Sequence, residues 1–326
     1  MIIFKDMNRQ LMQFKQQMKN GRLAQSFLVV GPEKTGKFST VVKMTGLLND
    51  LSDRELELVE KGEMADIILL QAEEGNDKKK DNGFKKKQSG QEEGRNKKSN
   101  SPGVITKKSL DQAIKTIKLK NFQLKKKVLI IRDADKLTDT ATNSLLKLIE
   151  EPQKDLIIFL LVNNEDDVLG TIKSRCQKIN FFLSTSEEVQ KMLEEDFDLK
   201  KDILEKIMEL SGGRIVLARE YAQDTKKVEQ AIKRRDDFRR ALRLGKIERF
   251  KLVDKILADD TDLLWVLNEW IWYLKIFLER GIERGESVAF LKKVCSIIER
   301  LTEVRGLIKA TNVNKKIQLE NFFVQI

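Results

Sequence analysis

The stretch GPEKTGKFST, from Gly31 to Thr40, has residues that could bind the phosphates of a nucleotide. A phosphate-binding loop follows the pattern Gly, four residues, Gly-Lys and then Ser or Thr. Small residues let backbone N–H groups turn towards the phosphates at the start of a helix, and the lysine reaches the outer phosphates. Gly31, Gly36 and Lys37 match this pattern. Phe38 replaces the hydroxyl residue that would bind Mg²⁺.

The stretch LIIRDADKLTDTATNSLLKLIEEP, residues 129–152, bears on the second requirement, an acidic residue that holds Mg²⁺. It resembles the Walker B strand and the following helix of clamp-loader ATPases of the AAA+ class, which carry Asp-Glu-Ala-Asp or a close variant. Aligned on Asp135, Arg132 stands at the metal-binding aspartate and Asp133 at the catalytic glutamate. A cation cannot ligate Mg²⁺. With Asp133 as the metal ligand, Ala134 falls at the position of the base, so neither frame gives a complete site.

The tripeptide Ser174, Arg175 and Cys176 lies in the segment LLVNNEDDVLGTIKSRCQKINF, residues 160–181. This segment resembles the sensor strand of the same family and the helix after it. In clamp loaders the tripeptide supplies an arginine finger to the ATP of the neighbouring subunit. A guanidinium suits this role because it is always charged and offers forked donors to phosphate oxygens. The resemblance implies that Arg175 is such a finger, and a surface arginine in a capping or salt-bridge role is the alternative.

Two further segments resemble sensor elements of the family. Asn163 and Asn164 occupy the polar sensor position, although plain hydrogen bonding at a strand end explains them equally well. The stretch SGGRIVLARE, residues 211–220, resembles the start of the sensor-2 helix. An arginine of active members falls on Val216 here, and Arg214 is out of frame, so no sensor-2 arginine is assigned.

These residues need a parallel sheet to bring them together. Short, nearly continuous apolar runs are typical of strands that are covered on both faces. Such runs occur at residues 26–30, 66–70, 127–132, 155–162 and 178–182. Helical patterns lie between them at residues 7–20, 37–50, 107–119 and 139–150. The alternation of strand and helix predicts βαβ units.

The second half of the chain has helical patterns and no strand pattern after residue 183. We expect an AAA+ nucleotide-binding-like domain at 1–183, a small helical lid domain at 184–225 and a helical collar domain at 226–326. Within the first domain, residues 73–103 contain nine basic and six acidic residues and one bulky apolar side chain, Phe84. That composition cannot bury enough apolar surface to offset chain entropy, which predicts a disordered basic insertion.

The composition limits the classes of function. Lysine and arginine exceed acidic residues by 62 to 51, giving a net charge of +11, which indicates an anionic partner such as nucleic acid or a solvated basic surface. The chain has no histidine and only two cysteines, Cys176 and Cys295, which excludes a histidine base and a four-ligand zinc site. The apolar segment 263–278 contains Glu269 and Lys275, which favours a buried helix over a membrane span. We expect a cytoplasmic protein without membrane contact.

The resemblance extends over nearly the whole chain except residues 73–103, and residues 311–326 resemble the last helix of a clamp-loader collar. It points to the delta-prime branch of the bacterial DNA polymerase III clamp-loader family. It implies an α/β AAA+ fold, with a parallel sheet flanked by helices, followed by two all-α domains. Many members have a cysteine-ligated zinc module after the phosphate-loop helix. This chain has a lysine-rich insertion instead, so no zinc is expected.

The resemblance and the incomplete metal site together predict a non-catalytic clamp-loader subunit without ATPase activity of its own. Arg175 would act on the ATP of a gamma/tau-like neighbour. A delta-like subunit, primer–template DNA bound without sequence preference, and the sliding clamp are the other expected partners. No cofactor is assigned firmly, since Gly31, Gly36 and Lys37 permit weak ATP binding whereas Phe38 crowds the pocket. No metal is expected.

Two other functions stay open on the sequence. An active gamma-like ATPase subunit is favoured by Gly31, Gly36 and Lys37, but Phe38 and Arg132 oppose it because both affect the same Mg²⁺ ion. A basic DNA-binding adaptor would act through its lysine-rich insertion. Deletion of that insertion separates the adaptor, which would lose DNA affinity, from a ring subunit, which would still assemble.

Overall fold

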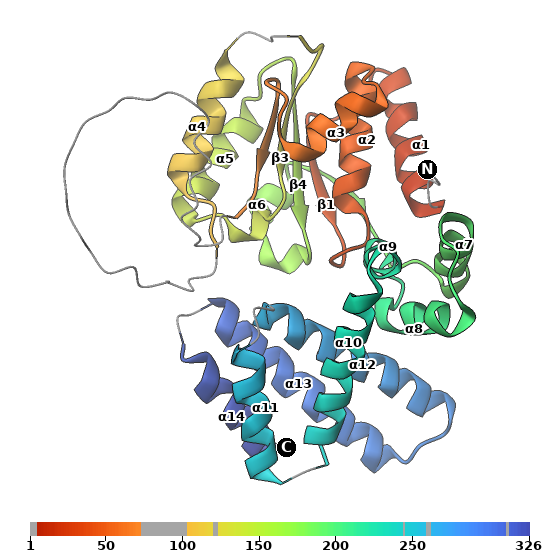
Figure 1. Ribbon diagram of the computed structural model, residues 1–326. Coiled ribbons are helices and arrows are strands. Elements are labelled where there is room, and N and C mark those ends of the chain that lie inside the picture. Colours follow the sequence, from red (N-terminus) through yellow and green to blue (C-terminus); the bar gives the residue numbers. More distant parts are fainter. Residues whose placement is uncertain (1–4, 73–102, 120–122, 244, 259–261, 311–312) are drawn as a thin grey trace, which may run out of the picture. The chain divides into compact units, whose positions relative to one another are not determined.

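The structure, a computed structural model, divides into two compact units, Met1–Phe182 and Leu183–Ile326. It describes residues 5–72, 103–119, 123–243, 245–258, 262–310 and 313–326 (Figure 1). The predicted insertion at 73–103 lies outside the described residues apart from Gly103. The division of residues 184–326 into a lid and a collar stays a prediction.

The first unit is built on a parallel sheet of five strands in the order β2-β3-β4-β1-β5. The strands are β1 (Ser26–Val30), β2 (Ile67–Leu70), β3 (Lys127–Ile131), β4 (Leu156–Val162) and β5 (Gln177–Asn180). Every pair of neighbours in the sheet is parallel. The five strands predicted from apolar runs are therefore confirmed, as is the parallel sheet.

Helices cover both faces of this sheet (Figure 1). One face carries α1 (Lys5–Lys19), α2 (Lys37–Asn49) and α3 (Asp53–Lys61), and the other carries α4 (Lys107–Lys118), α5 (Asp139–Glu150) and the short α6 (Gly170–Lys173). Two 3-10 turns, η1 (Ala134–Lys136) and η2 (Glu165–Asp167), follow β3 and β4. The four helices expected between the strands are present. Helix α3 was not expected, although Ser52 and Glu55 form a capping box at its start.

The two faces of the sheet have separate cores because successive strand residues point to opposite sides. In β3, Val128 and Ile130 belong to the core beside α1 and α2, whereas Leu129 and Ile131 belong to the core beside α4 and α5. All of these side chains are fully buried. The strands have nearly continuous apolar sequences because both faces are covered.

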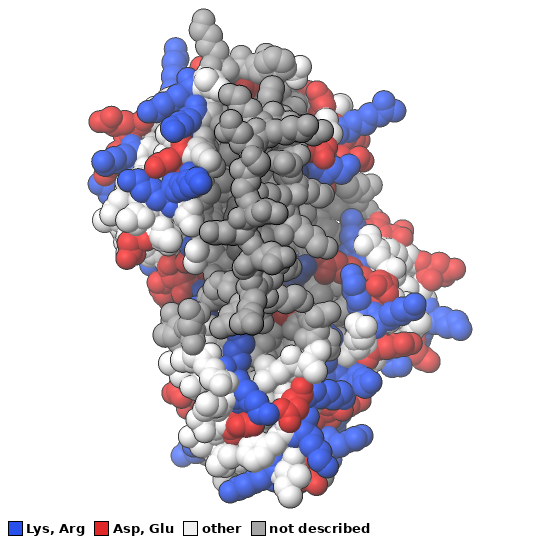
Figure 2. Space-filling view, turned by 60° about the vertical axis from the view of Figure 1, so that its left-hand side comes forward, with Lys and Arg blue, Asp and Glu red and all other residues white. Residues whose placement is uncertain are grey.

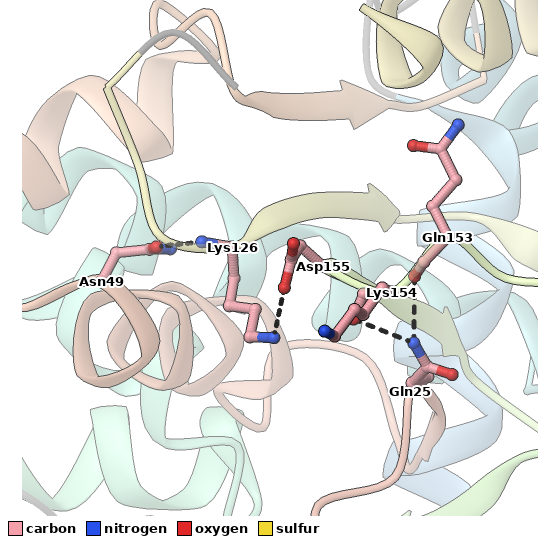
Figure 3. A network of polar contacts seen from close by, with 6 residues as sticks. All are labelled: Gln25, Asn49, Lys126, Gln153, Lys154 and Asp155. Carbon is pink, nitrogen blue, oxygen red and sulfur yellow. Dashed lines mark hydrogen bonds and ion pairs between the residues drawn. The ribbon is translucent and has the colours of Figure 1, made fainter. Parts of the chain in front are cut away.

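A network of polar contacts ties the amino ends of the strands together (Figure 3). The side-chain amide of Gln25, just before β1, donates to the backbone oxygen of Gln153 at 3.0 Å. The backbone N–H of Lys126 donates to Oδ1 of Asn49 at 2.8 Å, and the Lys126 ammonium lies 2.8 Å from Oδ1 of Asp155. These contacts connect the segments that lead into β1, β3 and β4. Ligand sites of open parallel sheets form at the opposite, carboxyl edge.

The second unit consists of helices throughout its described residues. They are α7 (Ser186–Asp196), α8 (Lys201–Ser211), α9 (Ile215–Gln223), α10 (Thr225–Ala241), α11 (Lys246–Ala258), α12 (Leu263–Glu283), α13 (Val288–Ala310) and α14 (Lys315–Gln325). The ring of Trp270 in α12 stacks on Phe238 at a centroid distance of 4.3 Å and meets Phe323 at 6.1 Å. The apolar segment 263–278 is thus part of a core helix. Among the described helices, none has the length and apolar character needed to cross a membrane.

Candidate functional site at the carboxyl edge of the sheet

Three neighbouring strands carry the predicted site residues at their carboxyl ends. Gly31 follows β1, Arg132 follows β3 and Asn163 follows β4, and these strands lie in the order β3-β4-β1. Because the strands are parallel, the loops after them leave the same edge of the sheet. The fold therefore brings the phosphate-loop-like segment, the Walker-B-like segment and the sensor-like position to one place.

The phosphate-loop-like segment depends on its two glycines. A Cβ atom on Gly31 would lie 2.4 Å from the backbone oxygen of Phe181, which follows β5. No larger residue fits there without moving the backbone. Gly36 has a φ of 93°, a left-handed conformation that glycine adopts readily, and helix α2 begins at the next residue, Lys37. The sequence therefore forms the turn that the motif requires.

The ammonium of Lys37 is turned back into its own loop. It donates to the backbone oxygens of Gly31 and Pro32, the latter at 2.8 Å. It also donates to Oδ1 of Asn163 at 3.0 Å. The side chain is only 9% exposed. Oxygens of the protein thus take the place that phosphate oxygens hold beside this lysine in a nucleotide-bound loop.

Burial also controls the protonation of Lys37. Removal of the ammonium from water lowers the pKa of Lys37 from 10.5 to about 8. The negative charges of Glu33, Asp135 and Asp133 act in the opposite direction and raise this pKa. The lysine is consequently mostly charged at neutral pH, but it loses its proton far more easily than an exposed lysine does.

The two departures from the nucleotide-binding pattern touch each other. The guanidinium carbon of Arg132 lies 4.4 Å from the centroid of the Phe38 ring. Such a cation–π contact contributes about 0.5–1 kcal/mol at an exposed site. Phe38 also packs against the core beside α1 and α2. Nη1 of Arg132 donates to Oε1 of Gln71 at 3.3 Å. Sequence reasoning placed both departures at one metal position but did not foresee their stacking.

The Mg²⁺ ion that AAA+ ATPases use does not fit this arrangement. Hard oxygen ligands would have to hold it, and here a phenyl ring and a guanidinium are stacked on each other. Asp133 accepts a hydrogen bond from the N–H of Ala72 at 3.4 Å and lies 3.5 Å from Nζ of Lys136. Within the described ranges, no three His, Cys, Asp or Glu side chains are grouped to hold a metal. No metal-dependent step follows from these residues.

The two asparagines after β4 make different contacts. Asn163 accepts a hydrogen bond from Lys37, so it faces the phosphate-loop-like segment. Asn164 accepts from the backbone N–H of Asp166 at 3.2 Å and caps η2. The geometry therefore gives Asn164 the strand-end role that the sequence left open. The sensor-like role stays a prediction for Asn163.

Arg175 lies at the surface just after α6. Its Nη1 donates to the backbone oxygen of Thr171 at 3.1 Å, and its Nη2 lies 2.9 Å from Oε1 of Glu150. The side chains of Arg175 and Glu150 are 41% and 47% exposed. The hydroxyl of Ser174 donates to Thr171 as well, at 3.1 Å. Cys176 is half-buried, and burial raises the pKa of its thiol to about 11.

Glu150 is a contact of the site that sequence reasoning missed. It is the last residue of α5, and the charged ending Glu150-Glu151 before Pro152 was the only available signal. An exposed ion pair contributes at most about 1 kcal/mol. The ion pair with Glu150 therefore holds Arg175 only weakly.

Arg214, the arginine beside the sensor-2-like position, is held inside the second unit. Its side chain is 8% exposed, and its guanidinium carbon lies 4.7 Å from the centroid of the Trp272 ring. Arg214 directly precedes α9 and serves as its N-cap residue. Its packing gives no reason to assign it a sensor role.

A profile of the family described as "DNA polymerase III, delta subunit" matches residues 7–184. The chain belongs to this family. The delta-prime subunit of DNA polymerase III from Bacillus subtilis is 41% identical over 80 residues, 24% of each chain. That of Haemophilus influenzae is 28% identical over 198 residues, 59% of this chain and 58% of the relative. These matches span less than two thirds of either relative.

A solved structure supports the fold of this delta-prime-like family member. The gamma subunit-related protein of DNA polymerase III from Thermotoga maritima has a TM-score of 0.55 and 16% sequence identity. The match covers 96% of this chain and 98% of the other. The expected fold class is confirmed: an α/β AAA+ sheet flanked by helices, followed by a helical part.

Proposed function

We propose that this chain is a non-catalytic subunit of a bacterial clamp loader and that Arg175 completes the ATP site of an adjoining ATPase subunit. The stack of Arg132 on Phe38 carries the first half of the proposal. By the resemblance to clamp-loader ATPases, Mg²⁺-dependent phosphoryl transfer would need a carboxylate and a hydroxyl at these two positions, where this chain has a cation and an apolar ring. The hydrogen bonds of Lys37 to its own loop support an inert pocket, because they must break before a phosphate can bind.

The environment of Arg175 supports the second half of the proposal. A finger that acts in trans must be exposed and must be able to leave its resting partners. Arg175 is exposed, and its ion pair with Glu150 is of the weak surface kind. A triphosphate in a partly dry interface offers several negative oxygens to the forked donors of a guanidinium.

The partners follow from the same assignment. We propose a gamma/tau-like ATPase subunit as the receiver of Arg175, a delta-like subunit as another neighbour, and action in the cytoplasm. Primer–template DNA, bound without sequence preference, and the sliding clamp complete the set. The net charge of +11 agrees with proximity to DNA, because contacts with phosphates release counterions.

Substitution of Arg175 in a reconstituted complex tests the proposal. An arginine finger contributes about 10³ to 10⁵ to the rate of phosphoryl transfer. We expect Arg175→Ala to slow ATP hydrolysis at the adjoining site by about 10³-fold or more, with assembly unchanged. Single-turnover kinetics resolve that site from the others, and size-exclusion chromatography follows the assembly.

Two matched variants make the result specific. Lys173→Ala removes a partly exposed positive charge from the end of the same short helix and should leave hydrolysis unchanged. Arg175→Lys keeps the charge but loses the fork, so it should restore only part of the rate. Unchanged hydrolysis in Arg175→Ala, or an equal loss in Lys173→Ala, would remove the finger assignment.

A further inference from the structure

A groove in the second unit gathers arginine and aromatic side chains that the proposed function does not use. It has a volume of about 190 Å³ and is lined by parts of α8, α10, α12 and α13 and by the connection between α12 and α13. Its arginine and aromatic residues are Arg235, Arg239, Arg280, Arg284, Tyr273, Phe277 and Phe290. Glu209 and Glu286 are the acidic residues of the lining. Figure 2 shows basic and acidic side chains mixed on one face of the protein.

The arginines form two pairs, each with the spacing of one helical turn. Arg235 and Arg239 lie on α10, while Arg280 lies in the last turn of α12 and Arg284 is the C-cap residue that follows it, so the members of each pair lie on one side of their helix. Glu209 of α8 holds one member of each pair, with its oxygens 3.2 Å from Arg235 and 3.3 Å from Arg280. The other two arginines, Arg239 and Arg284, are exposed, and Arg239 lies 3.7 Å from Oδ1 of Asp236. The groove therefore has two exposed guanidinium groups, and its other two guanidinium groups are paired with Glu209.

The floor between the arginine pairs is aromatic. Tyr273 and Phe277 stack at a centroid distance of 6.1 Å, and Phe277 meets Phe290 edge-on at 5.8 Å. Phe277 is 39% exposed and Phe290 is 37% exposed, although both are large apolar side chains. The guanidinium of Arg235 lies 5.8 Å from the ring centroid of Tyr273. Partly exposed rings beside cations suit a polymer that has flat bases and negatively charged phosphates.

We propose that this groove binds single-stranded nucleic acid, with phosphates beside Arg239 and Arg284 and a base stacked on Phe277 and Phe290. Stacking on an aromatic ring tolerates any base, and arginine suits phosphate. An acidic peptide would match the charge of the arginines. It has no flat bases to stack on the partly exposed rings of Phe277 and Phe290, so the aromatic lining favours nucleic acid.

The proposal assigns the DNA contact proposed above to a specific groove. It rests on the proposed function only for the role of that contact in the clamp loader. The groove residues and their contacts do not involve Arg175. The test uses the isolated full-length chain without other subunits or ATP, whereas the finger is tested by hydrolysis in the reconstituted complex. Failure of one proposal is thus separate from failure of the other.

Fluorescence anisotropy with a labelled oligothymidylate of about 12 nucleotides measures the binding. Salt dependence is expected to have a slope of about −0.7 per phosphate contact on a single strand. The double variant Arg239→Ala, Arg284→Ala should therefore bind more weakly, and the magnitude of its slope should be smaller by about 1.4. Phe290→Leu should weaken binding by about fivefold or more at an unchanged slope, because it removes stacking but no charge.

Arg240→Ala is the matched control, since Arg240 is exposed on the same helix as Arg239 but does not line the groove. It should bind like the wild type. The basic insertion stays in every variant, so its contribution cancels. A labelled oligouridylate forms a second arm of the experiment. Loss of affinity in the groove variants, for either the DNA or the RNA strand, supports the site. The strand for which affinity is lost identifies the polymer.

Three results would overturn the proposal. The first is wild-type affinity and slope in the double arginine variant. The second is an equal loss in Arg240→Ala, which would assign binding to general charge. The third is strong binding of an acidic peptide, with loss in the groove variants, when neither oligonucleotide binds. A duplex competitor should show no effect of Phe290→Leu, because its bases are not free to stack on the ring.

Discussion

Phe38 and Arg132 lie far apart in the sequence and form one contact in the structure. Phe38 alone would leave an apolar ring beside the phosphate-loop-like segment, and Arg132 alone would place a cation at the edge of the sheet with little to hold it. Together the two side chains stabilise each other, because the guanidinium lies over the ring in a cation–π contact. Residues in contact have coupled effects on free energy, so the two positions must be changed together to test their role.

Nucleotide binding tests this pair directly. Phe38→Thr together with Arg132→Asp restores a hydroxyl and a carboxylate at the positions where AAA+ ATPases hold Mg²⁺. We expect ATP binding that Mg²⁺ strengthens by about tenfold or more in this double variant, since it regains both ligands. Titration of a fluorescent ATP analogue with and without Mg²⁺ measures the effect.

The wild type and the two single variants are the controls for that titration. Each of these proteins keeps the Phe38 ring, the Arg132 cation or both, so Mg²⁺ should not strengthen ATP binding by any of them. Mg²⁺-dependent ATP turnover by the wild type, abolished by Lys37→Ala, would contradict the non-catalytic assignment altogether.

Lys37 should make the stability of the first unit depend on pH. Its pKa is lowered to about 8 in the folded state and is 10.5 as the ordinary value. Between these two values the unfolded chain holds more protons than the folded chain, so the free energy of unfolding rises with pH. The rise amounts to at most about 3 kcal/mol. Below pH 8 both states are protonated and this dependence ends.

Lys37→Met isolates this effect from other titrations. The variant should lose the rise between about pH 8 and pH 10.5 while it keeps the remaining pH dependence. Hydrogen exchange of amides in β1 and β4, measured over this range, reports on the first unit. An identical pH profile in the variant would show that the Lys37 ammonium is not costly to bury.

Sequence reasoning located the site residues better than it described their contacts. Gly31, Gly36 and Lys37 could be placed because the motif is local in the chain. The hydrogen bond from Lys37 to Asn163 joins residues on different strands, and the ion pair of Arg175 with Glu150 joins the ends of two helices. Such contacts depend on side-chain directions that only the packed fold determines.

At the scale of elements, the strands were predictable because each is a short apolar run covered on both faces. Helix α3 was missed for the opposite reason. Its sequence DRELELVEK is mostly charged, and only Val59 is buried. A helix that buries so little resembles a polar loop in the sequence, and the capping box from Ser52 to Glu55 was the one clear signal.

The turn after β1 should tolerate no side chain at Gly31. A methyl group there would lie 2.4 Å from the Phe181 oxygen, which is backbone and cannot rotate away. We expect Gly31→Ala to reduce the free energy of unfolding of the first unit by about 2 kcal/mol. Gly170→Ala is the control, because a Cβ there meets no atom within 4 Å. Hydrogen exchange in β1 distinguishes them, and equal stability of the two variants would show that the turn adjusts freely.

At the scale of the whole molecule, two compact units should respond separately to substitutions in their cores. The second unit contains a buried polar cluster around Glu269, whose side chain is 14% exposed. Glu269 accepts two hydrogen bonds from Arg234, at 2.8 and 2.9 Å. Tyr221 and Trp265 donate to it at 3.2 and 3.1 Å. These contacts join α9, α10 and α12.

Glu269→Ala should therefore destabilise the second unit by about 3 kcal/mol or more, because it leaves Arg234 charged, buried and without its carboxylate. Exchange in the first unit should be unchanged. Glu279→Ala removes an exposed carboxylate from the same helix and should have little effect. Loss of protection in both units of Glu269→Ala would show that they unfold as one.

The architecture of the whole chain was predictable because alternation of strands and helices gives way to helices alone near residue 183. The groove of the second unit was not. Arg239 and Phe290 are 51 positions apart in the sequence, and nothing in the local sequence of either indicates that they line one surface. Surfaces built from several helices become visible only when the helices are packed.

The contact between Arg132 and Phe38 also limits how this lineage can change. A substitution of Phe38 alone leaves Arg132 at the position that aligns with the metal-binding aspartate. A substitution of Arg132 alone leaves the Phe38 ring without its cation–π contact. Neither intermediate gains anything that selection could retain. If the pocket is inert as proposed above, hydrolysis would therefore be hard to regain by successive single substitutions.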